Sequence, residues 1–206
     1  MARNLFKMLM IAGCLLVSGY SNAQLYINGA QFFIESGATV TVQGDLTSNV
    51  DILGTGKVLL KGSSNQNIDM NNFTIPALEI DNVSNATLLS AAKIGTNLTF
   101  TNGNIILGSN NLTMASAATI TGPGISKFIV TNSTGKLVKS SLGGAPGFIY
   151  PVGNSPITYN PVTIVNTGTV DDIAVRAFGN AFTTGLTGSA FTKEVVDASW
   201  DISEAT

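Results

Sequence analysis

KIGTNLTFTNGNIILGSNNLTMASAATIT, residues 93–121, is the stretch that decides the fold. Pairs of apolar residues, two positions apart, recur along it at a spacing near seven. The pairs are Leu98 with Phe100, Ile105 with Leu107, Leu112 with Met114, and Ala118 with Ile120. Residues two apart on a strand point to the same face, so each pair directs two side chains into a common interior. The stretch therefore predicts a stack of short strands.

A longer period of 20 residues connects this stretch with the sequence before it. Positions 38, 58, 78, 98 and 118 hold Ala, Val, Leu, Leu and Ala, and positions 40, 60, 80, 100 and 120 hold Val, Leu, Ile, Phe and Ile. The positions between the two rows are polar except for Leu59. An antiparallel meander also gives a spacing of about seven, but a three-stranded coil of a parallel β-helix gives both spacings.

We therefore predict an all-β chain that begins with a parallel β-helix, or solenoid, of about 20 residues per coil over residues 24–124. The neighbours expected across coils are Leu78 and Ala118 for Leu98, and Ile80 and Ile120 for Phe100. Turn residues fall at the expected corners, where Gly adopts positive φ at little cost and Asn tolerates it. These residues are Gly95, Gly103, Gly108, Asn97, Asn102, Asn104, Asn110 and Asn111.

The pattern changes after Gly122-Pro123-Gly124, a strong breaker of regular structure. Beyond it the 20-residue register is lost and the strand candidates become longer and more widely separated. They are residues 127–131, 136–139, 147–150, 161–165, 173–178 and 194–202. This spacing predicts a small antiparallel β-sandwich-like region over residues 125–206. Trp200 and Ile202 still alternate with polar residues near the end, so we expect this region to be incomplete.

The N-terminal 23 residues have the pattern of a secretory signal peptide. Arg3 and Lys7 form a basic start, residues 8–17 an apolar run, and Ser21-Asn22-Ala23 a small-residue cleavage site. We expect cleavage between Ala23 and Gln24, a secreted or outer-surface location, and no transmembrane segment in the mature chain. A lipobox ending at Cys14, which would carry a lipid, is the alternative.

Composition limits the chemistry open to this chain of 206 residues. It is 44% hydrophobic, enough for a sizeable core, but only 11% charged. Without Arg3 and Lys7, 8 basic residues face 12 acidic ones, so nucleic acid is not an expected partner. There is no His, and Cys14 is the only Cys, so imidazole catalysis, disulfides and thiolate metal sites are not expected in the mature chain. We expect no cofactor and no metal site.

Several phrases resemble large surface or secreted proteins of Bacteroidetes-type bacteria. The phrases are GKVLLKGSSNQNI, IPALEIDN, TNLTFTNGNIILGSNNLTM and AATITG, followed by FIYPVG, YNPVTI and DDIAVRAF. Members of that family carry β-helical, adhesin-like repeats and often a C-terminal domain for type IX secretion. The resemblance implies an adhesive role at the cell surface. We expect the chain to be a fragment that lacks this sorting domain, and a type IX route requires that the full protein continue beyond Thr206.

Parallel β-helices also include polysaccharide lyases and hydrolases, which need clustered carboxylates. The candidates are Asp45, Asp51, Asp69, Glu79 and Asp81. Asp69 and Asp81 have the residue types of a glycosidase pair, but no spacing argument brings them together. No Arg lies between Gln24 and Arg176, which favours solvated turn carboxylates. Asp171-Asp172 with Asn166 offers oxygen ligands for calcium, although a polar hairpin turn is the favoured interpretation of these residues.

Aromatic side chains are the candidates for stacking on a sugar ring. The candidate residues are Phe32, Phe33, Tyr150 and Tyr159. Phe32 and Phe33 are neighbours in a strand, so one of them is expected to face outward.

Taken together, these observations favour a non-enzymatic, exported structural or adhesion module that acts as a stiff spacer. Its expected partner is an extracellular glycan or surface protein. The alternative is a carbohydrate-active β-helix protein, either an enzyme or a glycan-binding module.

Overall fold

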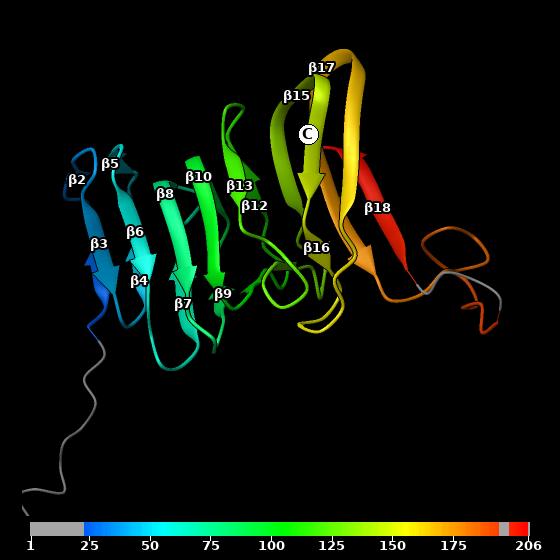
Figure 1. Ribbon diagram of the computed structural model, residues 1–206, viewed down its shortest axis with the longest axis horizontal. Coiled ribbons are helices and arrows are strands. Elements are labelled where there is room, and N and C mark those ends of the chain that lie inside the picture. Colours follow the sequence, from blue (N-terminus) through cyan, green and yellow to red (C-terminus); the bar gives the residue numbers. More distant parts are fainter. Residues whose placement is uncertain (1–22, 194–197, 206) are drawn as a thin grey trace, which may run out of the picture.

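The computed structural model describes residues 23–193 and 198–205, and this part of the chain is all-β (Figure 1). Within these ranges there is no helix that is long and apolar enough to cross a membrane. The expected signal peptide lies outside the described residues apart from Ala23, and so do residues 194–197 of the expected last strand. At the predicted cleavage site, Ala23 and Gln24 are exposed and directly precede the first strand.

In the described part of the chain, the strands form three sheets. The first contains β1 (Leu25–Ile27), β4 (Leu46–Ser48), β7 (Gln66–Asp69), β9 (Ala86–Leu88), β11 (Ile105–Ile106), β14 (Ile129–Val130) and β16 (Val152–Gly153). The second contains β3 (Thr39–Val42), β6 (Lys57–Leu60), β8 (Thr74–Asp81), β10 (Ala92–Asn102), β12 (Leu112–Met114), β13 (Thr119–Thr121), β15 (Leu137–Tyr150), β17 (Val162–Phe178) and β18 (Ser199–Glu204). The third contains β2 (Phe32–Ile34) and β5 (Ile52–Gly54).

The chain visits these sheets in turn and makes about 6 turns of a parallel β-solenoid, with about 20 residues per turn. Figure 1 shows the turns stacked side by side along the longest axis, from the N-terminal end to the C-terminal end. Neighbouring turns pair through parallel strands, such as β6 with β8 and β8 with β10. The predicted fold class is therefore confirmed.

The interior is a set of apolar columns that run through the stack. Val58 lies beside Leu78, and Leu78 lies beside Leu98. Leu60, Ile80 and Phe100 form the next column, and the side chains of both columns are buried. No single turn encloses these side chains, because each is covered by the turns on either side. The hydrophobic effect therefore stabilises the stack as a whole rather than any one coil.

The register departs from a strict 20-residue repeat at both ends. Val40 pairs with Val58 instead of Leu60, and Leu98 pairs with Ile120 instead of Ala118. The carbonyl oxygen of Phe100 correspondingly lies against Gly122 rather than against Ile120. Of the neighbours expected for Leu98 and Phe100, those in the preceding turn, Leu78 and Ile80, were right. Those expected in the following turn were wrong. A slide of two residues leaves every side chain on its original face, so the apolar pattern does not reveal it.

The sequence pattern predicted that parallel pairing ends at Gly122-Pro123-Gly124. In the structure, parallel pairing continues beyond these residues. Ile129 pairs with Ile105, and Leu137 pairs with Leu112, both in parallel. The antiparallel part begins only where β15 pairs with β17 and β17 pairs with β18. The loop before β14 lengthens this turn and hides its repeat, whereas the buried side chains of Ile129 and Leu137 continue the core.

Two of the three predicted corner glycines have the expected backbone. Gly103 has φ of 78° and Gly108 has φ of 58°. Gly95 instead lies inside β10, at an irregularity between Ile94 and Asn97 where the strand passes a corner without a break. The prediction of positive φ was therefore wrong for Gly95.

Buried amides line one edge of the solenoid. Asn82 Nδ2 donates to Gln66 Oε1 at 2.9 Å, and the Phe128 N–H donates to Asn104 Oδ1 at 2.9 Å in a later turn. All three amide side chains are buried, which is costly unless their polar atoms are bonded. They connect successive turns, as expected for Asn at the corners of a coil.

Candidate functional site

The carboxylates on the outer face of the second sheet are bonded from coil to coil. Glu79 accepts hydrogen bonds from Lys57 Nζ at 2.5 Å and from Thr101 Oγ1 at 2.7 Å. These bonds, first from Lys57 and then from Thr101, hold the pKa of Glu79 below its usual value. A carboxylate that stays ionised and bonded on both oxygens is poorly suited to act as a general acid.

Asp81 repeats this arrangement, with a lysine and an amide as its partners. Lys61 Nζ donates to Asp81 Oδ2 and Asn102 Nδ2 donates to Asp81 Oδ1, both at 2.7 Å. The bond from Lys61, followed by that from Asn102, lowers the pKa of Asp81. Glu79 and Asp81 therefore connect three successive strands rather than form an open acidic pair.

The remaining candidate carboxylates also face the backbone or lie apart. Asp45 Oδ1 accepts from the Asn67 N–H at 2.7 Å, and Asp51 Oδ1 accepts from the Thr74 N–H at 2.6 Å. Asp69 ends β7 in the first sheet, whereas Asp81 ends β8 in the second, so the structure does not pair them on one face. Among residues 23–193 and 198–205, no three His, Cys, Asp or Glu side chains are grouped so as to hold a metal ion.

The predicted sugar-stacking aromatics do not form one platform. Phe33 is 60% exposed, as strand alternation predicted, while Phe32 packs against the core. Tyr150 is completely buried, and its hydroxyl donates to the Ile173 carbonyl oxygen at 3.0 Å, so its prediction as a stacking residue is wrong. Tyr159 is half-buried, with its ring 5.2 Å from that of Phe128.

The oxygen-rich residues considered for calcium are bonded within the β15–β17 hairpin. Asn166 Nδ2 donates to the carbonyl oxygens of Leu142 and Thr169, at 2.9 and 2.7 Å. Asp171 Oδ1 accepts from the N–H of Asp172 at 2.7 Å. This is the geometry of a polar hairpin, as the simpler interpretation predicted.

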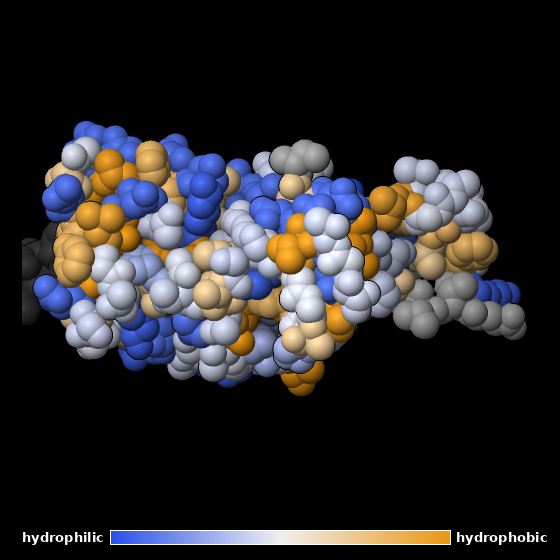
Figure 2. Space-filling model, turned by 90° about the horizontal axis from the view of Figure 1, so that it is seen from above, coloured by the Kyte–Doolittle hydropathy of each residue, from blue (hydrophilic) through white to orange (hydrophobic). Residues whose placement is uncertain are grey.

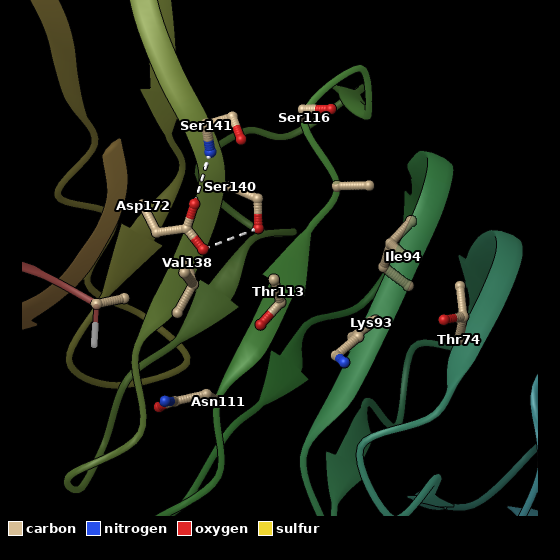
Figure 3. Close-up of a pocket in the computed structure, with 12 residues that line it drawn as sticks. Thr74, Lys93, Ile94, Asn111, Thr113, Ser116, Val138, Ser140, Ser141 and Asp172 are labelled. Atoms are coloured by element: carbon tan, nitrogen blue, oxygen red, sulfur yellow. Dashed lines mark hydrogen bonds between the residues drawn. The ribbon is translucent and has the colours of Figure 1, made fainter. Parts of the chain in front are cut away.

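A groove of about 480 Å³ lies on the outer face of the second sheet (Figure 3). Its floor is a row of outward residues that pair across neighbouring strands, in the order Thr74, Lys93, Thr113 and Val138. Asp172 and Ser140 stand on the opposite side from Lys93, with Thr113 between them (Figure 3). The groove thus carries one cation and one anion on opposite walls.

The anionic wall is fixed by hydrogen bonds within the hairpin. Asp172 Oδ1 accepts from the Ser141 N–H at 2.7 Å, and Asp172 Oδ2 accepts from Ser140 Oγ at 3.3 Å. Ser141 has φ of 52°, which turns β15 away from the solenoid at this point. The hairpin therefore rises beside β12 and leaves the hollow above Thr113.

A buried lysine lies next to the groove. Lys139 lies on the same inward face of β15 as Leu137, and it pairs with Met114 of the neighbouring coil. Its Nζ donates to the carbonyl oxygens of Ala115, Ser116 and Ala118, at 2.6, 2.8 and 2.8 Å. It also lies 5.0 Å from the centre of the Phe148 ring. Burial lowers the pKa of Lys139.

The sequence patterns did not predict the groove, although they contain the row of outward residues that forms its floor. Thr74, Lys93 and Thr113 recur close to the 20-residue period, which places them in one outward row. Asp172 comes from a strand that follows much later, and its position depends on the antiparallel hairpin. The pairing of that hairpin has no repeat in the sequence.

An ion-pair cluster attaches β18 to the preceding strands. Asp201 Oδ2 lies 2.9 Å from Lys136 Nζ and 3.1 Å from Arg176 Nε. Burial on its own raises the pKa of Asp201, but the hydrogen bonds and charges of Lys136 and Arg176 outweigh it, so the pKa lies below its usual value. This cluster is structural, because both cations bind the same carboxylate oxygen of Asp201.

Comparisons of the chain with models of protein families, with curated proteins and with solved structures find no match.

Proposed function

We propose that this protein is a non-enzymatic, exported surface module in which the solenoid serves as a stiff spacer. The observation that carries the proposal is the bonding of outward polar groups from one coil to the next. Lys57 with Glu79 and Lys61 with Asp81 are examples, and Asn97 Nδ2 donates to Thr119 Oγ1 at 2.7 Å further along. These side chains hold neighbouring coils together.

The stacking also gives the module a defined length. Paired strands are separated by ~4.8 Å, so about 6 turns extend roughly 29 Å along the stack. Every turn is attached to the next by backbone bonds and by the buried columns, which resists bending at any single joint. Figure 2 shows the elongated outline from above, with hydrophobic and hydrophilic residues interspersed along it.

Export and surface location belong to the same proposal. They are supported by the basic start, apolar run and small-residue cleavage site of residues 1–23. The resemblance of the repeat phrases to Bacteroidetes-type surface proteins supports an adhesive setting, with an extracellular glycan or surface protein as partner. Fractionation of cells that produce the chain with and without residues 1–23 tests export, since only the first form should leave the cytoplasm.

Small-angle X-ray scattering of residues 24–206 tests the spacer. An elongated particle that keeps its dimensions when salt screens the surface ion pairs is the expected result, because the apolar columns and backbone bonds remain. A compact, isotropic particle would contradict the proposal. Cleavage of plant, algal or host polysaccharides that is lost in Asp69→Ala or Asp81→Ala would also contradict it and establish the enzymatic alternative.

A further inference from the structure

We propose that the groove between Lys93 and Asp172 binds a carboxylated saccharide, such as a uronic acid unit of an acidic polysaccharide. This goes beyond the spacer role, since it assigns a ligand to one face of the C-terminal half of the solenoid. Four observations carry it: the size of the groove, the available ammonium, the opposing carboxylate and the hydroxyl-rich floor.

The groove has the dimensions of a small-ligand site. Its volume of about 480 Å³ lies within the range of about 300–1,000 Å³ that is typical of such sites. Its floor residues Thr74, Lys93 and Thr113 lie on consecutive strands, so the groove runs across the strands of the sheet (Figure 3). A chain of linked sugars can therefore enter and leave lengthwise.

Lys93 supplies a positive charge that the fold does not use. In the part of the chain that the structure describes, Lys57, Lys61 and Lys136 pair with carboxylates, whereas no carboxylate lies within ion-pair distance of Lys93. The side chain of Lys93, on the floor of the groove, is also exposed. An ammonium group in this setting favours an anionic group on the ligand through a charge-assisted hydrogen bond.

Asp172 sets the orientation of the ligand. Its two oxygens each hold one hydrogen bond, from Ser140 and Ser141, and an ionised carboxylate has about four acceptor positions. The remaining positions can accept ligand hydroxyl groups, while the negative charge repels a ligand carboxylate. The carboxylate of the ligand is thereby directed to Lys93 and its hydroxyl groups to Asp172.

The floor suits a sugar ring rather than a lipid or a polyphosphate. Thr113 and Asn111 offer hydroxyl and amide groups that both donate and accept, and the partly exposed Ala115 offers apolar surface for C–H groups. A single lysine cannot neutralise a row of phosphates. The combination of one charge and several hydroxyl partners matches a polyhydroxylated acid.

NMR titration and calorimetry of residues 24–206 with digalacturonate test the proposal, with neutral galactobiose and acetate as comparison ligands. Digalacturonate should bind and shift the amide signals of Thr113, Ser140 and Ser141, and both comparison ligands should bind more weakly. Lys93→Met should weaken binding roughly tenfold or more, as expected for loss of a charge-assisted bond. Thr113→Val, which keeps the side-chain shape, should weaken it by a smaller factor.

Lys61→Met is the matched control, because Lys61 directly follows β6 of the same sheet but is bonded to Asp81. It should leave digalacturonate binding unchanged. Absence of binding, equal affinity for galactobiose or acetate, or unchanged binding by Lys93→Met would each overturn the proposal. The scattering shape in the absence of sugar tests the spacer separately, so either conclusion can fail without the other.

Discussion

Lys139 Nζ lies 2.8 Å from the carbonyl oxygen of Ala118, inside the turn that follows β12. The same ammonium binds the carbonyl oxygens of Ala115 and Ser116, so one side chain holds three backbone acceptors. It lies where parallel pairing with β12 meets antiparallel pairing with β17. Lys139 therefore connects the solenoid to its C-terminal hairpin.

Lys139→Met should destabilise the protein by roughly 1–3 kcal/mol, because it keeps the apolar stem but leaves three buried or part-buried carbonyl groups without their donor. Urea denaturation measures the free energy of unfolding. Lys57→Met, which removes a partly exposed ion pair, is the control and should cost about 0–1 kcal/mol. Equal costs for the two variants would show that the ammonium of Lys139 does not stabilise the turn.

Gly103 and Gly108 provide a matched test of coil spacing, since both have positive φ. Alanine in the left-handed region costs roughly 1–2 kcal/mol in either position. A Cβ at Gly103 would also lie 1.9 Å from the Asn82 carbonyl oxygen in the neighbouring coil, whereas one at Gly108 meets nothing within 4 Å. Gly103→Ala should therefore lower the thermal midpoint clearly more than Gly108→Ala.

Acid should loosen the attachment of β18. The folded pKa of Asp201 lies below its usual value of 3.8, so its contribution to stability is present above that value and is lost as pH falls through the folded pKa. Asp201→Asn should lower stability at neutral pH and flatten the dependence of unfolding free energy on pH below about 4. An unchanged acid profile in this variant would assign the dependence to other carboxylates, such as Glu79.

High pH should destabilise the folded protein through the ionisation of Tyr150. Burial, followed by the charge of Asp172, holds the pKa of Tyr150 well above its usual value. An unfolded tyrosine ionises near pH 10, so the stability from Tyr150 is present below about pH 10 and is lost as pH rises toward the folded pKa. Ultraviolet absorbance should therefore show one tyrosine ionising only with unfolding. Tyr150→Phe should remove that coupled step, at a cost of about 0.5–1.5 kcal/mol for the lost bond to Ile173.

The central coils could be predicted from the sequence because their repeat is strict. Leu78 and Leu98 are neighbours as expected, since nothing is inserted between them. Ile120 could not be identified as the next partner of Leu98, because a two-residue slide keeps the same faces. The later turns were missed for a related reason: the loop before Ile129 breaks the period but not the pairing.

The candidate site was less predictable than the fold. Lys93 falls in an outward row, yet Asp172 reaches it only through the β15–β17 hairpin. The inward position of Lys139 follows from its place two residues after Leu137, but alternation alone does not show that a charge can be buried there. Such burial depends on the three carbonyl groups of a turn that ends a different coil.

Pulsed and continuous-wave EPR of paired spin labels test the parallel stack most directly. Outward residues Thr41, Leu59, Glu79, Thr99 and Thr121 lie in one register row across five strands. Label separation should increase by ~4.8 Å for each strand crossed, so a Thr41/Thr121 pair should be farther apart than a Leu59/Thr121 pair by that amount. Equal separations, or a Thr41/Thr121 pair closer than the Leu59/Thr121 pair, would contradict the solenoid and the spacer function built on it.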